Sequence, residues 1–236
     1  MIRGGARRLL VAASLVVVAC ATGLDPAAKE DVDRRVTALT APSQTFPAPT
    51  APTPLPLAVG QWTQHELIDD QGRPSFLTTK VVGEDLGSYW LELVEETYSG
   101  RRVTRMLVYF ADRSTAATMD IRAIKTRVGK GPVKDATTEE LRSSRTDWAG
   151  VLSMLAVGWE GASQEEVRAP AGVFAGAYKK DTDESWGPML AKSTTWSHPT
   201  VPLSGLVRAQ ATERRNSLLL VSFGEKGALS EIPDAL

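Results

Sequence analysis

Residues 88–110 read SYWLELVEETYSGRRVTRMLVYF, and this stretch decides the fold class of the chain. Two runs rich in β-branched, aliphatic and aromatic residues flank the dipeptide Ser99-Gly100, which is typical of a tight turn. Alternation in the second run places Val103, Leu107 and Tyr109 on one face and Met106, Val108 and Phe110 on the other. The stretch therefore predicts a β-hairpin with apolar side chains on both faces.

Two further strand-like segments precede this hairpin. Residues 60–69 (GQWTQHELID) and residues 76–82 (FLTTKVV) are separated by a turn that contains Gly72 and Pro74. Together with the hairpin they make four candidate strands at short spacing. This arrangement indicates an antiparallel sheet.

The segment after the hairpin supports two interpretations. Residues 113–128 fit a helix, because their aliphatic residues recur at helical spacing. Residues 119–128 fit a strand equally well, and the turn GKGP (129–132) would end it. Residues 138–157 predict the clearest helix of the chain, since Leu141, Trp148, Leu152 and Leu155 share one face.

Strand-like segments return in the last third of the chain. They are residues 167–180, 189–198, 203–212 and 216–224. The chain thus holds seven or eight candidate strands and one clear helix, with 42% hydrophobic and 23% charged residues overall. We expect residues 58–236 to form a single, mainly β (α+β) domain with one or two helices packed on its sheet.

The N-terminus has the layout of an export signal. Residues 1–8 carry three arginines and no acid, and residues 9–19 are apolar apart from Ser14. An apolar run of this length is too short to span a bilayer, which takes roughly 20 residues. Residues 1–19 therefore predict a secretory signal peptide.

The signal sequence ends in Val17-Val18-Ala19-Cys20, which holds the only cysteine of the chain. This sequence resembles the lipobox of bacterial lipoproteins. The resemblance implies cleavage before Cys20 and acylation of its thiol and amine by chains of the palmitate type, which anchor a protein stably in a membrane. Ala21 follows where an aspartate would favour retention in the inner membrane, so the resemblance also implies an outer-membrane lipoprotein that faces the periplasm.

Residues 20–57 predict a tether between the lipid and the domain. Residues 26–39 could form a short helix, with Asp25 as its N-cap and Pro26 in its first turn. Residues 41–56 (APSQTFPAPTAPTPLP) favour an extended, semi-rigid spacer that would reach roughly 50 Å. A proline-rich ligand for a partner domain is the alternative interpretation of residues 41–56.

Two phrases in the last third resemble sequences of uncharacterised periplasmic lipoproteins. They are APAGVF (169–174) and WSHPTVPLSGLV (196–207). The supposed fold of those proteins is similar to that of the LolA/LolB lipoprotein carriers. The resemblance implies a curved antiparallel sheet, or half-barrel, closed by helices around an apolar cavity, but it transfers no catalytic or binding residue. Within these phrases, we expect Gly172 to permit a close approach to another strand.

Catalytic and metal-binding patterns are weak. His65 and His198 lie far apart in sequence, and zinc sites use three or four ligands. The adjacent pairs Asp69-Asp70 and Glu95-Glu96 would point to opposite faces of a strand, so neither predicts a paired carboxylate site. A formal net charge of −1 gives no basic field for nucleic acid. We therefore expect no enzyme activity, no cofactor, no metal and no nucleic-acid partner.

Aromatic side chains provide the candidate binding site. The chain has six tryptophans, and ordinary core packing explains most such residues. If a cavity exists, Trp90, Tyr109, Phe110 and Trp148 are the residues that we expect to line it. The preferred hypothesis is a membrane-anchored module that binds a lipid-like ligand. The alternative is an envelope module with a filled core that holds a protein partner.

Overall fold

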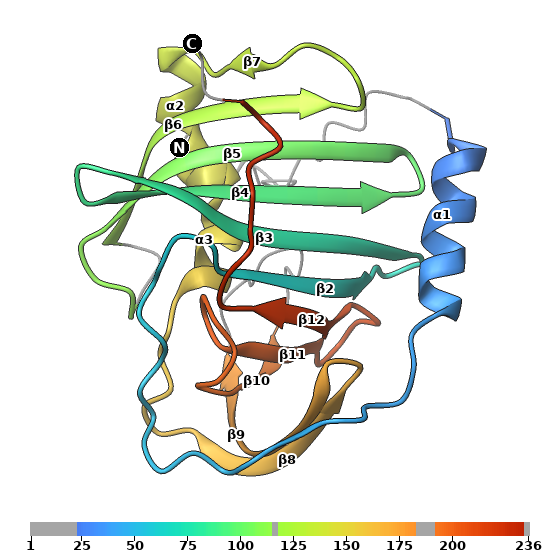
Figure 1. Cartoon of the computed structure of the whole chain (residues 1–236), viewed down its shortest axis with the longest axis vertical. Coiled ribbons are helices and arrows are strands. Elements are labelled where there is room, and N and C mark those ends of the chain that lie inside the picture. The colour runs from blue at the N-terminus through green and yellow to red at the C-terminus, as the bar shows by residue number, and fades with distance from the viewer. Residues whose placement is uncertain (1–22, 115–117, 183–191, 234–236) are drawn as a thin grey trace, which may run out of the picture.

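The computed structural model describes residues 23–114, 118–182 and 192–233. Within these ranges twelve strands form one curved, open sheet, and three helices pack around it (Figure 1). The strands are β1 (Thr45–Phe46), β2 (Trp62–Ile68), β3 (Pro74–Asp85), β4 (Ser88–Thr97), β5 (Gly100–Phe110), β6 (Met119–Val128), β7 (Lys134–Asp135), β8 (Ser163–Ala169), β9 (Gly172–Thr182), β10 (Ser193–Ser197), β11 (Leu206–Ala211) and β12 (Ser217–Gly224). The helices are α1 (Pro26–Thr37), α2 (Thr138–Asp147) and α3 (Ala149–Leu155). The prediction of a mainly β fold with a curved antiparallel sheet and few helices is confirmed.

The hairpin predicted over residues 88–110 lies inside the sheet as β4 and β5. Its register runs from Thr97↔Gly100 at the turn to Ser88↔Tyr109 at the far end without interruption. The strand order is β1-β9-β10-β11-β12-β2-β3-β4-β5-β6-β7, and β8 pairs with the other edge of β9. Both neighbours of the hairpin are antiparallel, as the sequence predicts.

One face of the sheet, which we call the inner face, packs against α2 and α3. Leu91 of β4, Met106 of β5 and Leu152 of α3 are among the buried residues of this main core. The strand interpretation of residues 119–128 is correct, since β6 pairs along its length with β5. The helix predicted over residues 138–157 is instead two short helices, because the backbone leaves the helical region at Trp148 (φ −104°, ψ 3°). Gly150 follows two residues later, and glycine weakens a helix at this point.

The single strand predicted over residues 167–180 is wrong. The segment forms a hairpin of β8 and β9, with Ala169 paired to Gly172 across the turn. Pro170 lies in this turn, and proline cannot donate a hydrogen bond to a central strand. Residues 163–182 therefore supply two strands, where the sequence predicts one.

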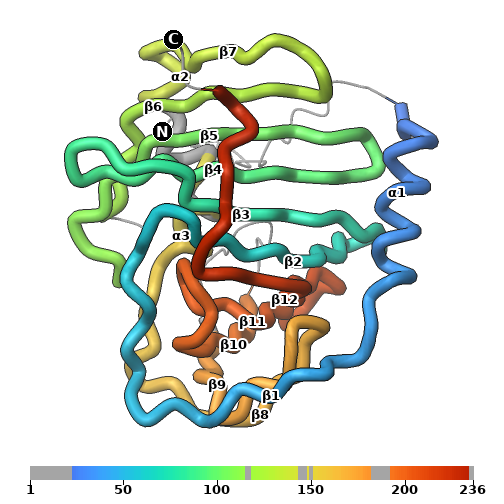
Figure 2. The backbone as a smooth tube through the Cα atoms, viewed as in Figure 1, coloured from blue at the N-terminus to red at the C-terminus, as the bar shows by residue number. Residues whose placement is uncertain are grey.

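The predicted tether packs on the domain instead of extending away from it. Helix α1 begins as expected, since the Asp25 carboxylate accepts hydrogen bonds from the N–H groups of Ala27 and Ala28. The chain then runs along the sheet as β1, which pairs in parallel with β9 (Figure 2). Residues 41–56 are extended in part, but the ring of Phe46 lies in a socket on the domain and not in solvent.

Phe46 holds this N-terminal strap, which we define as residues 44–49. Its ring stacks on Phe174 with centroids 4.6 Å apart and also contacts Phe223. A Cβ at Gly172 would lie 2.6 Å from the Phe46 ring, so only glycine fits there. The expected close approach at Gly172 is confirmed, although its partner comes from the strap.

A second strap crosses the opposite, outer face of the sheet. The C-terminal strap, residues 228–233, leaves β12 and runs across the strands toward β6 (Figure 1). The Ala228 N–H donates to the carbonyl of Gly60, and Ile232 is fully buried against Val94 and Val103. Helices α2 and α3 thus cover the inner face of the sheet, whereas the C-terminal strap crosses the outer face.

Candidate functional site

The four residues predicted to line a cavity lie on two faces of the sheet. Phe110 and Trp148 pack against the main core on the inner face. Trp90 and Tyr109 point to the outer face, where the guanidinium groups of Arg105 and Arg122 lie 4.7 and 4.4 Å from their respective ring centroids. The structure therefore does not bring the four aromatic side chains into one site.

Between the inner face and α3 the described residues enclose a cavity of about 10 Å³, bounded by Val151, Met154 and Leu155 of α3, by residues of the sheet and by the segment before β11. This volume accommodates one water molecule at most. Sites for drug-sized ligands measure roughly 300–1,000 Å³, so this cavity as it stands is too small for an acyl chain.

His65 of β2 reaches this cavity from the sheet. Its side chain is buried, and Nε2 donates to the carbonyl of Leu206 at 3.0 Å, while Nδ1 has no hydrogen-bond partner among the described residues. Burial lowers the pKa of His65 to about 4, and the bond to Leu206 offsets this shift only in part. The imidazole is neutral at pH 7 and enclosed, so its role is structural.

His198 has a different task, since it fixes the N-terminal strap. Its Nε2 lies 3.1 Å from the carbonyl oxygen of Pro47, and its Nδ1 lies 2.8 Å from Thr200 Oγ1. Burial lowers the pKa of His198, and the hydrogen bond to Pro47 acts in the opposite direction. The two histidines belong to separate sites, as their sequence separation suggests.

The most elaborate polar site lies on the outer face around Glu92 of β4. This carboxylate is fully buried and accepts hydrogen bonds from Lys80 Nζ at 3.1 Å and from Ser230 Oγ at 2.7 Å. The backbone N–H groups of Glu231 and Ile232 also donate to it. Its oxygens are thus occupied by Lys80 and by the C-terminal strap, so Glu92 holds this strap on the sheet.

Arginine and lysine side chains complete this outer site. Arg105 Nη1 donates to the carbonyl of Ile232 at 2.9 Å. The carboxylate of Glu231 pairs with Lys80 at 2.7 Å and with Arg101 at 2.5 Å. This cluster was not predicted from sequence, because nothing local in β4 indicates that residues 230–232 cover it.

The tip of the β3–β4 hairpin carries an unusual exposed residue. Leu86 is 92% exposed and has a positive φ of 46°, which leucine rarely adopts. Gly87 follows it, and the acidic Glu84 and Asp85 precede it. Asparagine, aspartate or glycine normally occupies this turn position. The leucine was recognisable in sequence as the wrong residue for a tight turn.

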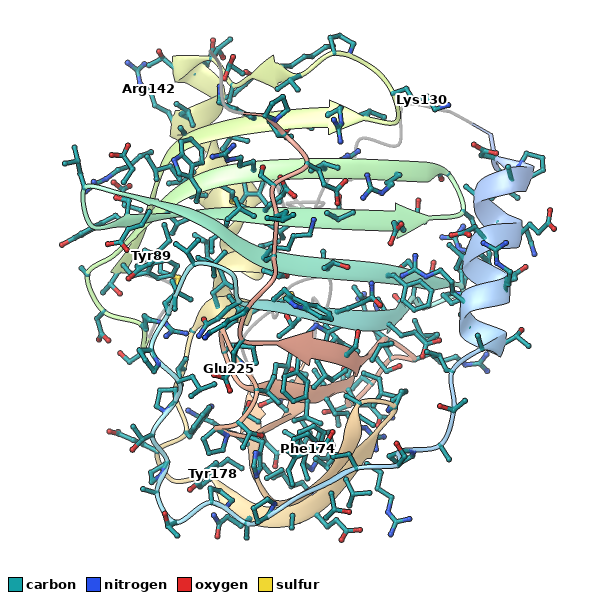
Figure 3. The ribbon with its side chains drawn as sticks, viewed as in Figure 1. Tyr89, Lys130, Arg142, Phe174, Tyr178 and Glu225 are labelled. Carbon is teal, nitrogen blue, oxygen red and sulfur yellow. The ribbon has the colours of Figure 1, made fainter. Side chains whose placement is uncertain are left out.

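The opposite end of the sheet, beside α1, holds a groove of about 890 Å³. The first turn of α1 and the β4–β5 turn border it, together with the segment after β6. Figure 3 shows Lys130 of that segment beside the N-terminal end of α1. The Asp25 N–H donates to the carbonyl of Tyr98 at 2.9 Å, so the chain is fixed to this end from Asp25 onward.

Cys20 lies outside the described residues, and its acylation remains a prediction. Within the ranges that the structure describes, no three His, Cys, Asp or Glu side chains gather closely enough to hold a metal ion. No described helix is both long and apolar enough to cross a membrane. A comparison with family models, curated proteins and solved structures finds no match for this chain.

Proposed function

We propose that the chain is an envelope lipoprotein, anchored through acylated Cys20, whose β-rich domain is a non-enzymatic interaction module. One observation carries this proposal: the cavity that the described residues enclose between the inner face and α3 measures about 10 Å³, which is too small for an acyl chain. Both straps cover the sheet with residues of the chain itself. A partner would therefore bind the outer surface of the domain.

The β3–β4 tip is the contact that fits this role best. Leu86 is an apolar side chain held out in solvent at a backbone conformation that costs free energy, and such strained positions concentrate at functional sites. Glu84 and Asp85 place negative charge beside it, which favours a protein pocket with a basic rim. The partner in this proposal is therefore a protein of the cell envelope.

Binding of an apolar chain is the second candidate function. It is favoured by the composition of the small cavity, whose wall is mostly aliphatic and includes three residues of α3. Helix α3 spans only seven residues, Ala149–Leu155. If α3 moved outward, the cavity would become an apolar pocket between the sheet and the helix.

One pair of measurements separates the two functions. Residues 23–236, exported with a cleavable signal peptide, would be examined by native mass spectrometry and titrated with a fluorescent fatty acid. The interaction module predicts a bare mass and no uptake. It also predicts that a photocrosslinker at position 86 captures an envelope protein, and that one at exposed Glu160 does not. A co-purified lipid, or uptake that is lost when Met154→Trp fills the cavity, would favour the second candidate instead.

A further inference from the structure

The proposed anchor and the folded domain are separated by very little chain. Only four residues lie between Cys20 and Asp25, whose backbone is fixed to the β4–β5 turn. The five Cα–Cα steps from Cys20 to Asp25 span at most roughly 18 Å, even when fully extended. The proline-rich segment adds nothing to this reach, because it follows α1 and packs against β9.

Helix α1, which follows this connection, is itself docked on the sheet. Val32 of α1 is buried, and Arg35 pairs with Glu96 of β4 at 2.6 Å. The Tyr98 hydroxyl donates to Asp33 at 2.6 Å. Contacts on successive turns fix the helix, so the point where the lipid-bearing segment joins the domain is fixed as well.

The surface around this point combines apolar side chains with a lysine. Leu24 and Val128 are 61% and 63% exposed, and Val133 is exposed nearby. Lys130 projects beside the start of α1 (Figure 3). Within α1 three bases balance three acids, and two of these acids are paired locally, Asp33 with Lys29 and Asp31 with Arg34, so the helix places little net repulsion against an anionic surface.

We infer that this anchor-proximal surface, formed by Leu24, Val128, Lys130 and Val133, lies against the lipid bilayer that holds Cys20. The inference rests on the proposed anchor. Exposed apolar residues beside a lysine suit the interface, where apolar groups contact the acyl boundary and an ammonium group meets phosphate. The opposite end of the sheet, with Leu86, then points away from the membrane, since β4 alone extends for about 33 Å.

The test uses the acylated full-length protein in vesicles of phosphatidylethanolamine and phosphatidylglycerol with a headgroup-linked nitroxide quencher. Because the Cys20 thiol is consumed by lipid, Lys130→Cys and Leu86→Cys each provide one labelling site for a fluorophore. We expect several-fold stronger quenching at position 130 than at position 86. Equal quenching at the two positions would overturn the inference.

A longer connection provides the matched control. A Gly/Ser insert of about 20 residues between Cys20 and Leu24 has a root-mean-square length of roughly 25 Å. We expect it to weaken quenching at position 130, whereas quenching that survives the insert would show that the surface also holds the bilayer by its own contacts. Intact mass and co-sedimentation with the vesicles show, independently of quenching, whether the protein carries acyl chains and binds the bilayer. A protein without acyl mass overturns the anchor and this inference together, whereas equal quenching in an acylated protein overturns this inference alone.

Discussion

A buried imidazole makes the stability of this domain sensitive to acid. The pKa of His65 is about 4 in the folded protein, against about 6.5 in an unfolded chain. The unfolded state therefore binds the proton more strongly, so stability is complete above pH 6.5 and falls as the pH decreases toward 4. A shift of this size corresponds to about 3 kcal/mol of unfolding free energy.

Urea unfolding at pH 7 and at pH 4.5 measures this loss. The His65→Gln variant has no imidazole, so the difference between the two pH values should be smaller in the variant by most of that amount. Carboxylates lose their ion pairs in both proteins and cancel in the comparison. An equal pH dependence in the two proteins would contradict a neutral, buried His65.

Some contacts of single residues could be predicted from sequence, and others could not. The need for glycine at position 172 was predicted, because glycine inside a strand indicates a close approach. That the approaching group is Phe46 was not predictable, since more than a hundred residues separate the two positions. The four aromatic residues were assigned to one cavity although alternation alone places Tyr109 and Phe110 on opposite faces of their strand. The pairing of β4 with β5, which the sequence did not define residue by residue, then places Trp90 on the face of Tyr109.

The C-terminal strap is an element that stabilises the sheet from outside. Ile232 fills a small apolar cluster with Val94 and Val103 on the outer face. Truncation of a buried aliphatic side chain to alanine costs about 2–5 kcal/mol, so Ile232→Ala should lower the unfolding free energy by about 2–4 kcal/mol. Leu229→Ala is the matched control, because Leu229 lies in the same strap and is 79% exposed.

Chemical denaturation of both variants measures how much the buried Ile232 side chain contributes to the unfolding free energy. We expect the Leu229→Ala variant to differ from the parent by less than about 0.5 kcal/mol, which is usual for surface positions. Equal, small effects of the two substitutions would mean that the strap is detached in solution and that Glu92 binds another group.

Helices and hairpins were predicted correctly where their cap or turn residues lie next to them in sequence. Helix α1 was predictable because its cap and its first-turn proline are adjacent in sequence. The β4–β5 hairpin was predictable for the same reason, since its turn lies between its strands. The hairpin of β8 and β9 was missed because apolar and small residues continue through its turn. Neither strap was predicted, since both depend on distant partners.

At the scale of the whole molecule, the N-terminal strap belongs to the fold. A chain of residues 58–236 matches the domain expected from sequence, but it lacks α1 and β1 and exposes the socket that Phe46 fills. Burial of each large apolar side chain is worth about 1.5–3 kcal/mol. Loss of Val32 and Phe46 should therefore destabilise the shorter chain by about 3–6 kcal/mol.

Thermal unfolding of residues 58–236 beside residues 23–236 tests this expectation. One kcal/mol shifts the Tm of a domain of this size by about 2–4 °C, so the shorter chain should unfold about 6–24 °C below the longer one. Phe46→Ala in the longer chain should reproduce part of the loss, whereas Thr45→Ala, at an exposed position of the same strap, should not. Identical transitions of the two chains would mean that residues 23–57 are a free tether that contributes nothing to the stability of the domain.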